Sequence, residues 1–228
     1  MRKYLVLAIM MLMVLSTVAF AAEAVKLSVE PFMEQVLERK VTQDEFSGKI
    51  SQGWYGTKVD ITLLDKLTVS PFIAGVGTGG KFEGEKIEAD SSFGYGLAVK
   101  ADLPLNLPVD ISLLSMIRAT KTDLNKVGEY ELSYNKDVDF LEYEFEAQVA
   151  KTLEIPNFVG KITPMIGVRY SDVKITGSPD MANIDLASKN NIGMSVGAKY
   201  DYNDTFGISV KAKLIDQTAI VVAGTIKF

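Results

Sequence analysis

The fold follows from nine consecutive residues, Leu141-Glu142-Tyr143-Glu144-Phe145-Glu146-Ala147-Gln148-Val149. Apolar residues occupy every second position, and the positions between them carry three glutamates and a glutamine. Successive side chains of a β-strand point to opposite faces, so a period of two gives a ribbon with one apolar and one polar face. A helix is the rival, because Glu, Ala, Leu and Gln favour helices and Leu141, Phe145 and Val149 would share a helical face. The strict alternation favours a strand.

The same period recurs in short bursts separated by clusters of Gly, Asn, Asp and Pro. It predicts ten strands, at residues 25–38, 47–63, 67–78, 92–103, 109–121, 139–154, 161–175, 191–202, 205–215 and 218–228. The connections alternate between short turns (64–66, 104–108, 155–160, 203–204) and longer loops (39–46, 79–91, 122–138, 176–190), with 216–217 as the exception. This pattern is typical of bacterial transmembrane barrels. We therefore expect an all-β protein, a closed antiparallel up-and-down transmembrane β-barrel of about ten strands, with eight as the alternative.

Composition excludes several kinds of chemistry. The 228 residues include neither cysteine nor histidine, which removes disulfides, thiolate nucleophiles, the commonest general base and the commonest transition-metal ligand. The net charge of −5 and the isoelectric point near 5.0 argue against binding to nucleic acid. The ordinary charged share of 23% and the modest number of 18 glycines argue against wholesale disorder. The length suits one domain or at most two small ones.

The N-terminus has the three parts of a secretory signal peptide. Arg2 and Lys3 precede an apolar run, which ends in small residues at Ala19 and Ala21. We predict cleavage after Ala21, which gives a signal peptide at 1–21 and a barrel domain at 22–228. An uncleaved membrane helix is the rival, because the 19 residues from Tyr4 to Ala22 are nearly free of charge.

Charged residues fall on the polar face of the predicted strands in nearly equal numbers of each sign, as expected if they pair across a narrow lumen. The glutamates at 142, 144 and 146 lie between strands that carry Arg118 and Arg169, which would supply partners. The predicted lumen network consists of Arg118, Glu142, Glu144, Glu146, Lys161, Arg169, Lys199, Lys211 and Lys213. A soluble sandwich with these charges in water is the alternative.

Aromatic residues recur at or near the ends of predicted strands, on the apolar face. Tyrosine prefers the membrane–water interface, where its ring is half buried and its hydroxyl stays hydrated. The recurrence therefore favours the membrane barrel over the soluble sandwich. The residues concerned are Phe93, Tyr95, Tyr143, Tyr170, Tyr200, Tyr202, Phe206 and Phe228.

The chain ends inside a predicted strand whose alternate residues are Ile220, Val222, Gly224, Ile226 and the terminal Phe228. This closely resembles the C-terminal signature of Gram-negative-type outer-membrane β-barrel proteins. Among these, the chain looks most like the small barrels grouped with the opacity proteins and the OmpA-type membrane domain, many of which have eight strands. The resemblance implies a place in the cell outer membrane, contact with its lipid, and recognition of the last strand by the barrel assembly machinery.

Individual residues give narrower expectations. Proline cannot donate to a strand ladder, so Pro31, Pro71 and Pro164 are expected near strand starts or at bulges. Trp54 is expected on the inner face as a packing residue. Two acidic clusters, Asn135 with Asp137 and Asp139, and Asp180 with Asn183 and Asp185, are read as solvated loops rather than calcium sites. We predict no metal and no cofactor.

Two functions remain open at this stage. The first is a small barrel with a charge-filled lumen and long extracellular loops, with a structural, adhesive or interaction role toward an unknown extracellular ligand or surface partner. The alternative is a narrow porin-like channel or transporter for small solutes or ions. Its space would come from glycines on the inner face, at Gly53, Gly56, Gly94, Gly96, Gly193 and Gly197. We predict no enzyme, because the hydrolases built on such barrels resemble this architecture but use a histidine.

Overall fold

The computed structural model describes residues 25–43, 46–82, 85–127, 130–156, 159–177 and 185–228. The predicted signal peptide at 1–21 lies outside the described residues, as do Asp180 and Asn183 of one acidic cluster. Among the described residues, no helix is long and apolar enough to cross a membrane.

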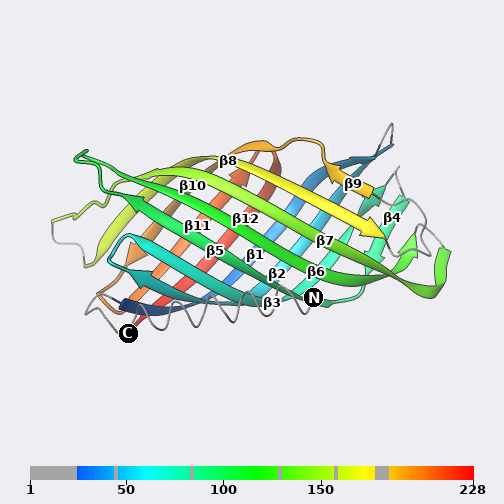
Figure 1. Ribbon diagram of the computed structural model, residues 1–228, viewed down its shortest axis with the longest axis horizontal. Coiled ribbons are helices and arrows are strands. Elements are labelled where there is room, and N and C mark those ends of the chain that lie inside the picture. Colours follow the sequence, from blue (N-terminus) through cyan, green and yellow to red (C-terminus); the bar gives the residue numbers. More distant parts are fainter. Residues whose placement is uncertain (1–24, 44–45, 83–84, 128–129, 157–158, 178–184) are drawn as a thin grey trace.

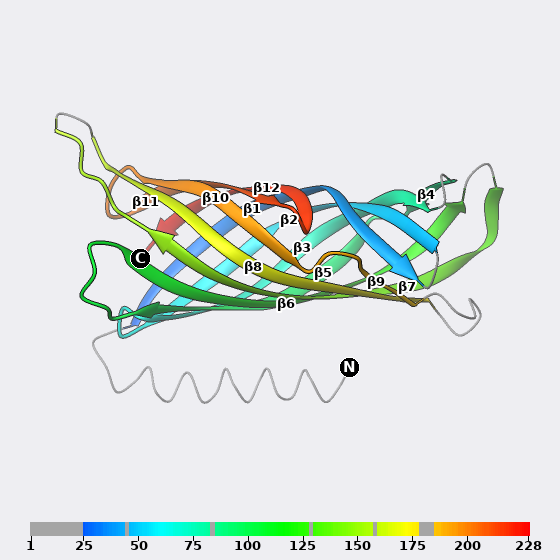
Figure 2. The same cartoon turned by 90° about the horizontal axis from the view of Figure 1, so that it is seen from above.

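The described chain folds into one antiparallel sheet that closes on itself as a tilted barrel (Figures 1 and 2). The nine-residue stretch of strict alternation is part of a strand, as predicted. The strands are β1 (Val25–Gln43), β2 (Phe46–Leu63), β3 (Leu67–Phe82), β4 (Glu85–Ala89), β5 (Ser92–Leu103), β6 (Asp110–Val127), β7 (Tyr130–Ala150), β8 (Lys161–Gly177), β9 (Asp185–Ser188), β10 (Ile192–Asp201), β11 (Phe206–Leu214) and β12 (Gln217–Lys227).

The two ends of the barrel differ. One end holds the first residue of β1, the last residue of β12 and the turns at 64–66, 104–109, 151–160 and 202–205; we call it the short-turn end. The other end, here called the hairpin end, holds the last described pairs of β1 with β2, β3 with β4, β6 with β7 and β8 with β9. In Figure 1, β4 and β9 mark the hairpin end and the C-terminus marks the short-turn end.

The number of strands in the wall changes along the axis. Toward the short-turn end, ten described strands form a ring in the order β1, β2, β3, β5, β6, β7, β8, β10, β11, β12, closed by pairs such as Phe32 with Ala223. The β11–β12 hairpin stops at residues 215–216, and beyond it β9 pairs directly with β1 at Val41 and Ser188. The hairpin end is therefore an eight-stranded ring of β1, β2, β3, β4, β6, β7, β8 and β9. Both counts considered from the sequence occur in one molecule.

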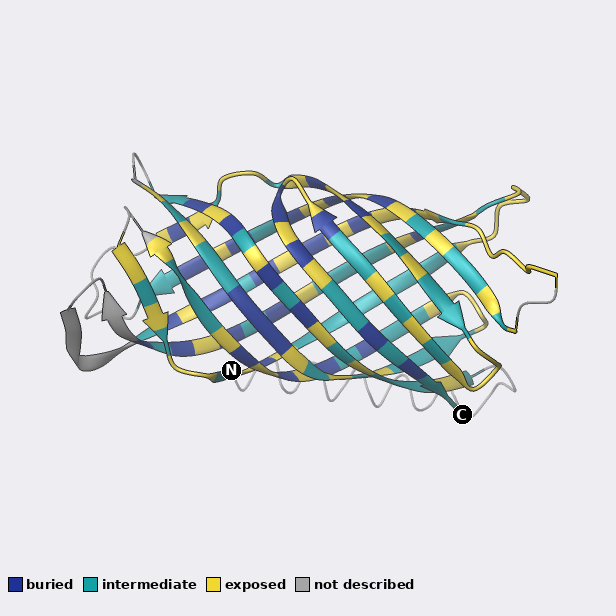
Figure 3. Cartoon of the chain, turned by 180° about the vertical axis from the view of Figure 1, so that it is seen from behind, coloured by how far each residue is buried: buried dark blue, intermediate teal, exposed yellow. Residues whose placement is uncertain are grey.

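The chemistry of the two faces exchanges where the ring narrows. Buried and exposed residues alternate along the strands of the barrel (Figure 3). Along β7, the even-numbered residues from Val138 to Gln148 point inward and are all buried. Toward the short-turn end the inward residues are Glu142, Glu144 and Glu146, and their outward neighbours are apolar. Toward the hairpin end the inward residues are Val138 and Phe140, and their outward neighbours include the exposed Asp139. Along β7, inward and outward residues alternate without interruption, and only the polarity of each face reverses.

The outward face toward the short-turn end is an apolar belt. Phe145, Val196 and Ile208 are 54%, 49% and 49% exposed, whereas Glu144, which precedes Phe145 on β7, is 8% exposed and points inward. This excludes the soluble sandwich, in which the apolar faces would meet one another. On β8 the outward apolar side chains run from Ile162 to Tyr170, which matches the about 9–11 residues that a tilted strand needs to cross a bilayer.

Exposed aromatic residues mark the edge of this belt. Tyr143 on β7 and Tyr170 on β8 lie well inside their strands, not at the strand ends that the sequence indicated. Each stands where the outward face changes from apolar to charged, with Asp139 and Asp172 following on the same face. Tyr202, Phe206 and Phe228 occupy the short-turn edge. The aromatic residues therefore follow the edges of the belt and not the ends of the strands.

The prediction of four long loops is wrong. Segments 39–46, 79–91, 122–138 and 176–190 consist, over most of their described length, of strand that continues beyond the belt. Their outward residues are charged, for example Lys40, Lys81, Asp137 and Asp185. A search for strands with an apolar outward face reads such segments as polar loops, which is why the sequence ended the strands too early.

The prolines lie in the part of their strands near the short-turn end. Pro164 and Pro71 are close to the starts of β8 and β3, as expected. Pro31 lies deeper in β1 and not at a bulge, since the β1–β2 register shifts only after Val36. Its pairing with β12 is interrupted at this point, whereas its pairing with β2 continues. The missing N–H of proline therefore affects the hydrogen bonds to one neighbouring strand only.

Two turns contain non-glycine residues with positive φ. The β2–β3 turn places Leu64 at 52° and Asp65 at 56°, the left-handed pair that a two-residue type I′ hairpin requires. The β11–β12 turn places Ile215 at 82°, which is strained for a β-branched side chain. This strained turn lies where the wall changes from ten strands to eight.

Candidate functional site

The lumen is crossed by a network of buried ion pairs about halfway along the barrel. Arg118 on β6 donates from Nε to Glu142 Oε2 at 2.7 Å and from Nη1 to Glu34 Oε2 at 2.7 Å. Arg39 on β1 donates to the other oxygen of Glu142 at 2.6 Å. Glu34 and Arg118 come from β1 and β6, which are not neighbours in the wall, so these bonds span the lumen.

A second set of ion pairs continues the network on the β8 side. Arg169 Nη2 lies 2.6 Å from Glu144 Oε2, and Nη1 lies 2.9 Å from Asp216 Oδ2. Asp216 also accepts from Ser171 Oγ at 2.6 Å. Lys213 Nζ joins the two sets, because it lies 2.9 Å from both Glu34 and Glu144.

Glu146 completes the network toward the short-turn end. Its Oε1 accepts from Lys211 Nζ at 3.0 Å and from Ser195 Oγ at 2.7 Å. We call the whole assembly the central network; it contains Glu34, Arg39, Glu142, Glu144, Glu146, Arg118, Arg169, Lys211, Lys213 and Asp216. Its five cations and five carboxylates balance, so the centre of the lumen holds no net charge. Moving an ion out of water costs several kcal/mol, and the close pairing of each charge with an opposite one offsets that cost.

Aromatic side chains fill the lumen beside the central network. Trp54, which was predicted on the inner face, is buried there, and the Arg118 guanidinium carbon lies 4.4 Å from its ring centroid. Phe32 and Phe72 meet edge to face with centroids 5.7 Å apart. The inner face is therefore less uniformly charged than the sequence indicated.

Glycines provide room for these groups and not for an open channel. A Cβ added at Gly94 would lie 2.3 Å from the Trp54 ring, and one at Gly193 would lie 1.9 Å from Asp216 Oδ1. The space that these glycines leave is thus already occupied by the side chains that block the lumen. Gly53 departs from the prediction, because it lies on the same outward face of β2 as Tyr55. A Cβ added at Gly53 would lie 2.9 Å from the Tyr55 ring.

The structure brings together seven of the nine residues predicted for the lumen network. The other two lie apart, toward the short-turn end. Lys161 pairs with Glu154 at 2.8 Å on the partly exposed rim, where this hydrogen bond lowers the pKa of the Glu154 carboxyl. Lys199 pairs with Asp201 at 3.0 Å inside the barrel mouth.

Sequence reasoning missed three members of the network. Glu34 falls on the polar face of the predicted strand 25–38, but the predicted network does not include it. Arg39 follows a register shift after Val36, which hides its inward orientation from any count of alternation. Asp216 lies in a turn, where no period applies. The inward positions of Arg39 and Asp216 follow only from the bulge in β1 and from the position of the β11–β12 hairpin tip.

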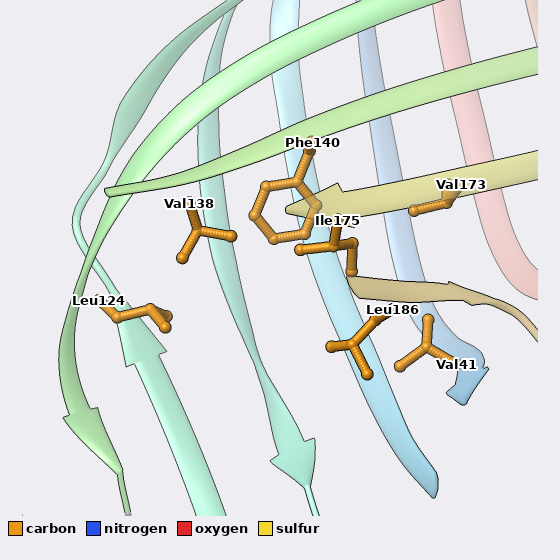
Figure 4. Packing of buried hydrophobic residues seen from close by; sticks show 7 residues of the cluster. All are labelled: Val41, Leu124, Val138, Phe140, Val173, Ile175 and Leu186. Atoms are coloured by element: carbon orange, nitrogen blue, oxygen red, sulfur yellow. The ribbon is translucent and has the colours of Figure 1, made fainter. Parts of the chain in front are cut away.

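The lumen beyond the central network is apolar. Seven buried side chains from β1, β6, β7, β8 and β9 point into it near the hairpin end (Figure 4): Val41, Leu124, Val138, Phe140, Val173, Ile175 and Leu186. Ile50 and Ile87 pack against them from β2 and β4. All of these residues except Val173 line a cavity of about 180 Å³, here called the chamber.

The short-turn end carries a wider, polar cleft of about 730 Å³ between the turns at 151–160 and 202–205. Its lining includes Glu154, Lys161, Asp201 and Lys227, which already pair with one another or with Lys199. Of the two acidic clusters, Asp137 and Asp139 alternate on β7 and face outward, and Asp137 pairs with Lys121. Within the described residues there is no group of three acidic side chains placed to hold a metal ion.

The last strand has the arrangement of a barrel seam. Ile220, Val222, Gly224 and Ile226 lie on the outward face of β12, which pairs with β11 on one side and β1 on the other. Phe228 donates its backbone N–H to Leu27 O at 2.9 Å, and its exposed ring lies at the edge of the apolar belt. Recognition of this strand by an assembly machinery stays a prediction.

These features define the class of protein. A closed antiparallel barrel with an outward apolar belt, aromatic residues at the edges of that belt and ion pairs inside is a transmembrane β-barrel of the outer membrane.

Comparison with known proteins finds similar solved structures at low sequence identity. No protein-family model and no curated protein matches the sequence. The translocator domain of autotransporter NalP from Neisseria meningitidis matches in structure with a TM-score of 0.48 and 9% identity, over 97% of this chain and 95% of that one. The transport unit of autotransporter AIDA-I from Escherichia coli matches with 0.47 and 10%, over 91% and 90%. The outer membrane protein OprG from Pseudomonas aeruginosa matches with 0.42 and 11%, over 90% and 96%.

Proposed function

We propose that this protein is a closed, non-conducting outer-membrane barrel without enzymatic activity. Its role is to bind a partner outside the cell, and the half of the barrel that extends beyond the membrane carries this role. The observation that carries the proposal is the central network. Its side chains are buried, their charges balance, and they join β1, β6, β7, β8 and β11 across the lumen. A hydrated ion would have to displace these pairs in order to pass.

The length of the strands supports the second part of the proposal. β1, β2, β6 and β7 have 18 to 21 residues, whereas about 9–11 residues cross a bilayer. The additional residues lie at the hairpin end, where the outward face carries both lysines and acidic residues. Barrels of this kind place short turns in the periplasm and longer connections outside the cell, so this end is proposed to be extracellular.

Single-channel recording in planar bilayers tests the closed lumen. The reconstituted protein is expected to be silent, and a triple variant Glu34→Ala, Arg118→Ala, Glu142→Ala is expected to show discrete openings. Gel mobility with and without boiling checks that each sample is a folded barrel. Discrete openings of the unaltered protein would contradict the proposal.

The orientation can be tested independently, because the chain contains no natural cysteine. Lys174→Cys places a thiol on the exposed outer wall of the hairpin end, and Asp204→Cys places one in a short turn. A membrane-impermeant maleimide added to intact cells is expected to label the first and not the second. The reverse labelling would invert the orientation.

A narrow pore is the second candidate, and one observation favours it. Between the central network and the short-turn end, Lys100, Asp102 and Lys199 line the lumen and are only partly buried, so water reaches the network from that side. If the network opened, this vestibule would supply a path with alternating charges. The same bilayer recording separates the two functions.

A further inference from the structure

We propose that the chamber at the hairpin end binds one small, uncharged, largely apolar molecule, of the size of a single aromatic ring or a short hydrocarbon. This site is separate from the central network, and its occupancy does not depend on whether the lumen conducts.

The inversion of polarity provides the first argument. Near the hairpin end the inward side chains are Val41, Leu124, Val138, Ile175 and Leu186, while charged residues face the surrounding water. A wall that only had to remain soluble outside the membrane could carry polar side chains on both faces. Apolar side chains that converge from β1, β2, β4, β6, β7, β8 and β9 instead create a water-poor interior (Figure 4).

The size of the chamber provides the second argument. These side chains do not fill the ring, and about 180 Å³ remains between them. An apolar cavity of about 150 Å³ in another protein stays dry and takes up benzene. Eight-stranded barrels have an interior just wide enough to be filled by side chains or to hold one small ligand. The narrowing from ten strands to eight therefore produces a compartment of the right width for a single small molecule.

The boundaries of the chamber define its ligand. Toward the membrane the way is blocked by the Arg39–Glu142 pair, one inward step below Val41 and Phe140. Toward the outside the lining reaches Gln43, whose side-chain oxygen accepts a hydrogen bond from the Asp185 N–H at 3.1 Å. A charged molecule would lose its hydration inside without gaining a partner, which excludes carboxylates and ammonium compounds. The chamber is thus a blind binding site for a neutral apolar molecule.

Cysteine protection tests the proposal on the full chain in phospholipid nanodiscs. Ile175→Cys places a thiol on the chamber wall, and the matched control Lys174→Cys places one on the outer face of the same strand. Both are modified with methyl methanethiosulfonate, a small neutral reagent, at increasing toluene concentration. We expect toluene to slow the modification of Ile175→Cys severalfold with saturation, and to leave Lys174→Cys unchanged. Benzoate, which has a similar ring and a charge, is expected to protect neither.

A filled chamber supplies the second readout. Adding Leu186→Trp to Ile175→Cys is expected to abolish the protection by toluene. If gel mobility shows that this double variant does not fold, Val138→Phe is used in place of Leu186→Trp. Protection that survives in a folded, filled variant would overturn the proposal. So would equal slowing at both cysteines, which would mean that toluene acts through the lipid, or no slowing at either one.

Discussion

Arg169 Nη1 lies 2.9 Å from Asp216 Oδ2, and both side chains are fully shielded from solvent. Asp216 belongs to the tip of the β11–β12 hairpin, and Arg169 belongs to β8, with β10 between them in the wall. The pair therefore fixes the hairpin tip at the level where the ring changes from ten strands to eight. It lies beside Gly193, whose missing side chain leaves the space that the Asp216 carboxylate occupies.

Removal of the charge at Asp216 is expected to destabilise the barrel strongly. Asp216→Asn keeps the shape of the side chain but leaves Arg169 with only Glu144 as a charged partner, and breaking a buried pair in this way costs about 3 kcal/mol. Urea-induced unfolding in lipid vesicles, followed by Trp54 fluorescence, measures the loss. The same change at Asp65, which pairs with Lys26 while both are well exposed, is expected to cost less than about 1 kcal/mol. Equal losses at the two positions would contradict this role of burial.

Relief of the strained turn is expected to stabilise the protein. Ile215 has a φ of 82°, where glycine carries no steric penalty, so Ile215→Gly should raise the free energy of unfolding by about 1 kcal/mol. Its neighbour Leu214 has no positive φ and pairs with Met194 in the wall, so Leu214→Gly should lower that free energy instead. The two unfolding midpoints, compared under identical conditions, check the prediction. A lower midpoint for Ile215→Gly would show that the side chain contributes more than the turn loses.

Gly94 and Gly77 offer a matched test of how tightly the lumen is packed. A Cβ at Gly94 meets the Trp54 ring at 2.3 Å, whereas a Cβ at Gly77 has no atom within 4 Å. Gly94→Ala is therefore expected to cost about 1–3 kcal/mol through overpacking, and Gly77→Ala to cost little. A shift in Trp54 fluorescence should accompany only the first change. If Gly94→Ala is harmless, Trp54 has room to move and the lumen is looser than described.

Charge on the outer wall is expected to have opposite consequences in the two halves of the barrel. Val196→Arg places a cation in the apolar belt and should cost about 2–4 kcal/mol, as for arginine near the bilayer midplane. Asp139→Arg, outward on the hairpin end, should stay within about 0.5 kcal/mol because its site is in water. Unfolding in vesicles measures both. Similar costs would mean that the membrane covers the hairpin end as well.

The sequence was most informative where one face meets lipid. In the belt, as at Ile192–Tyr200 and Phe206–Leu214, the alternation of apolar and polar residues gave the strands and their inward faces, because lipid on one side leaves no other arrangement. It was least informative at the hairpin end. There Val138, Phe140 and Ile175 keep the same alternation, but nothing in the pattern says that apolar now means inward.

The central network shows the same division. Glu142, Glu144 and Glu146 alternate on one strand, and the sequence identified Arg118 and Arg169 on the flanking strands, which the register indeed places beside Glu142 and Glu146. Arg39 and Asp216 could not be found in this way, because a bulge and a turn interrupt the period.

The sequence by itself determined the all-β architecture and the division of each belt strand into an apolar and a charged face, since each depends only on neighbours along one strand. The tertiary structure alone decided that the β11–β12 hairpin stops short, that β9 closes the ring onto β1 beyond it, and that the apolar face turns inward there. These depend on where distant segments meet. Which face of an alternating strand is the inner one is set by the surrounding medium, lipid or water, and that changes along the axis of this barrel.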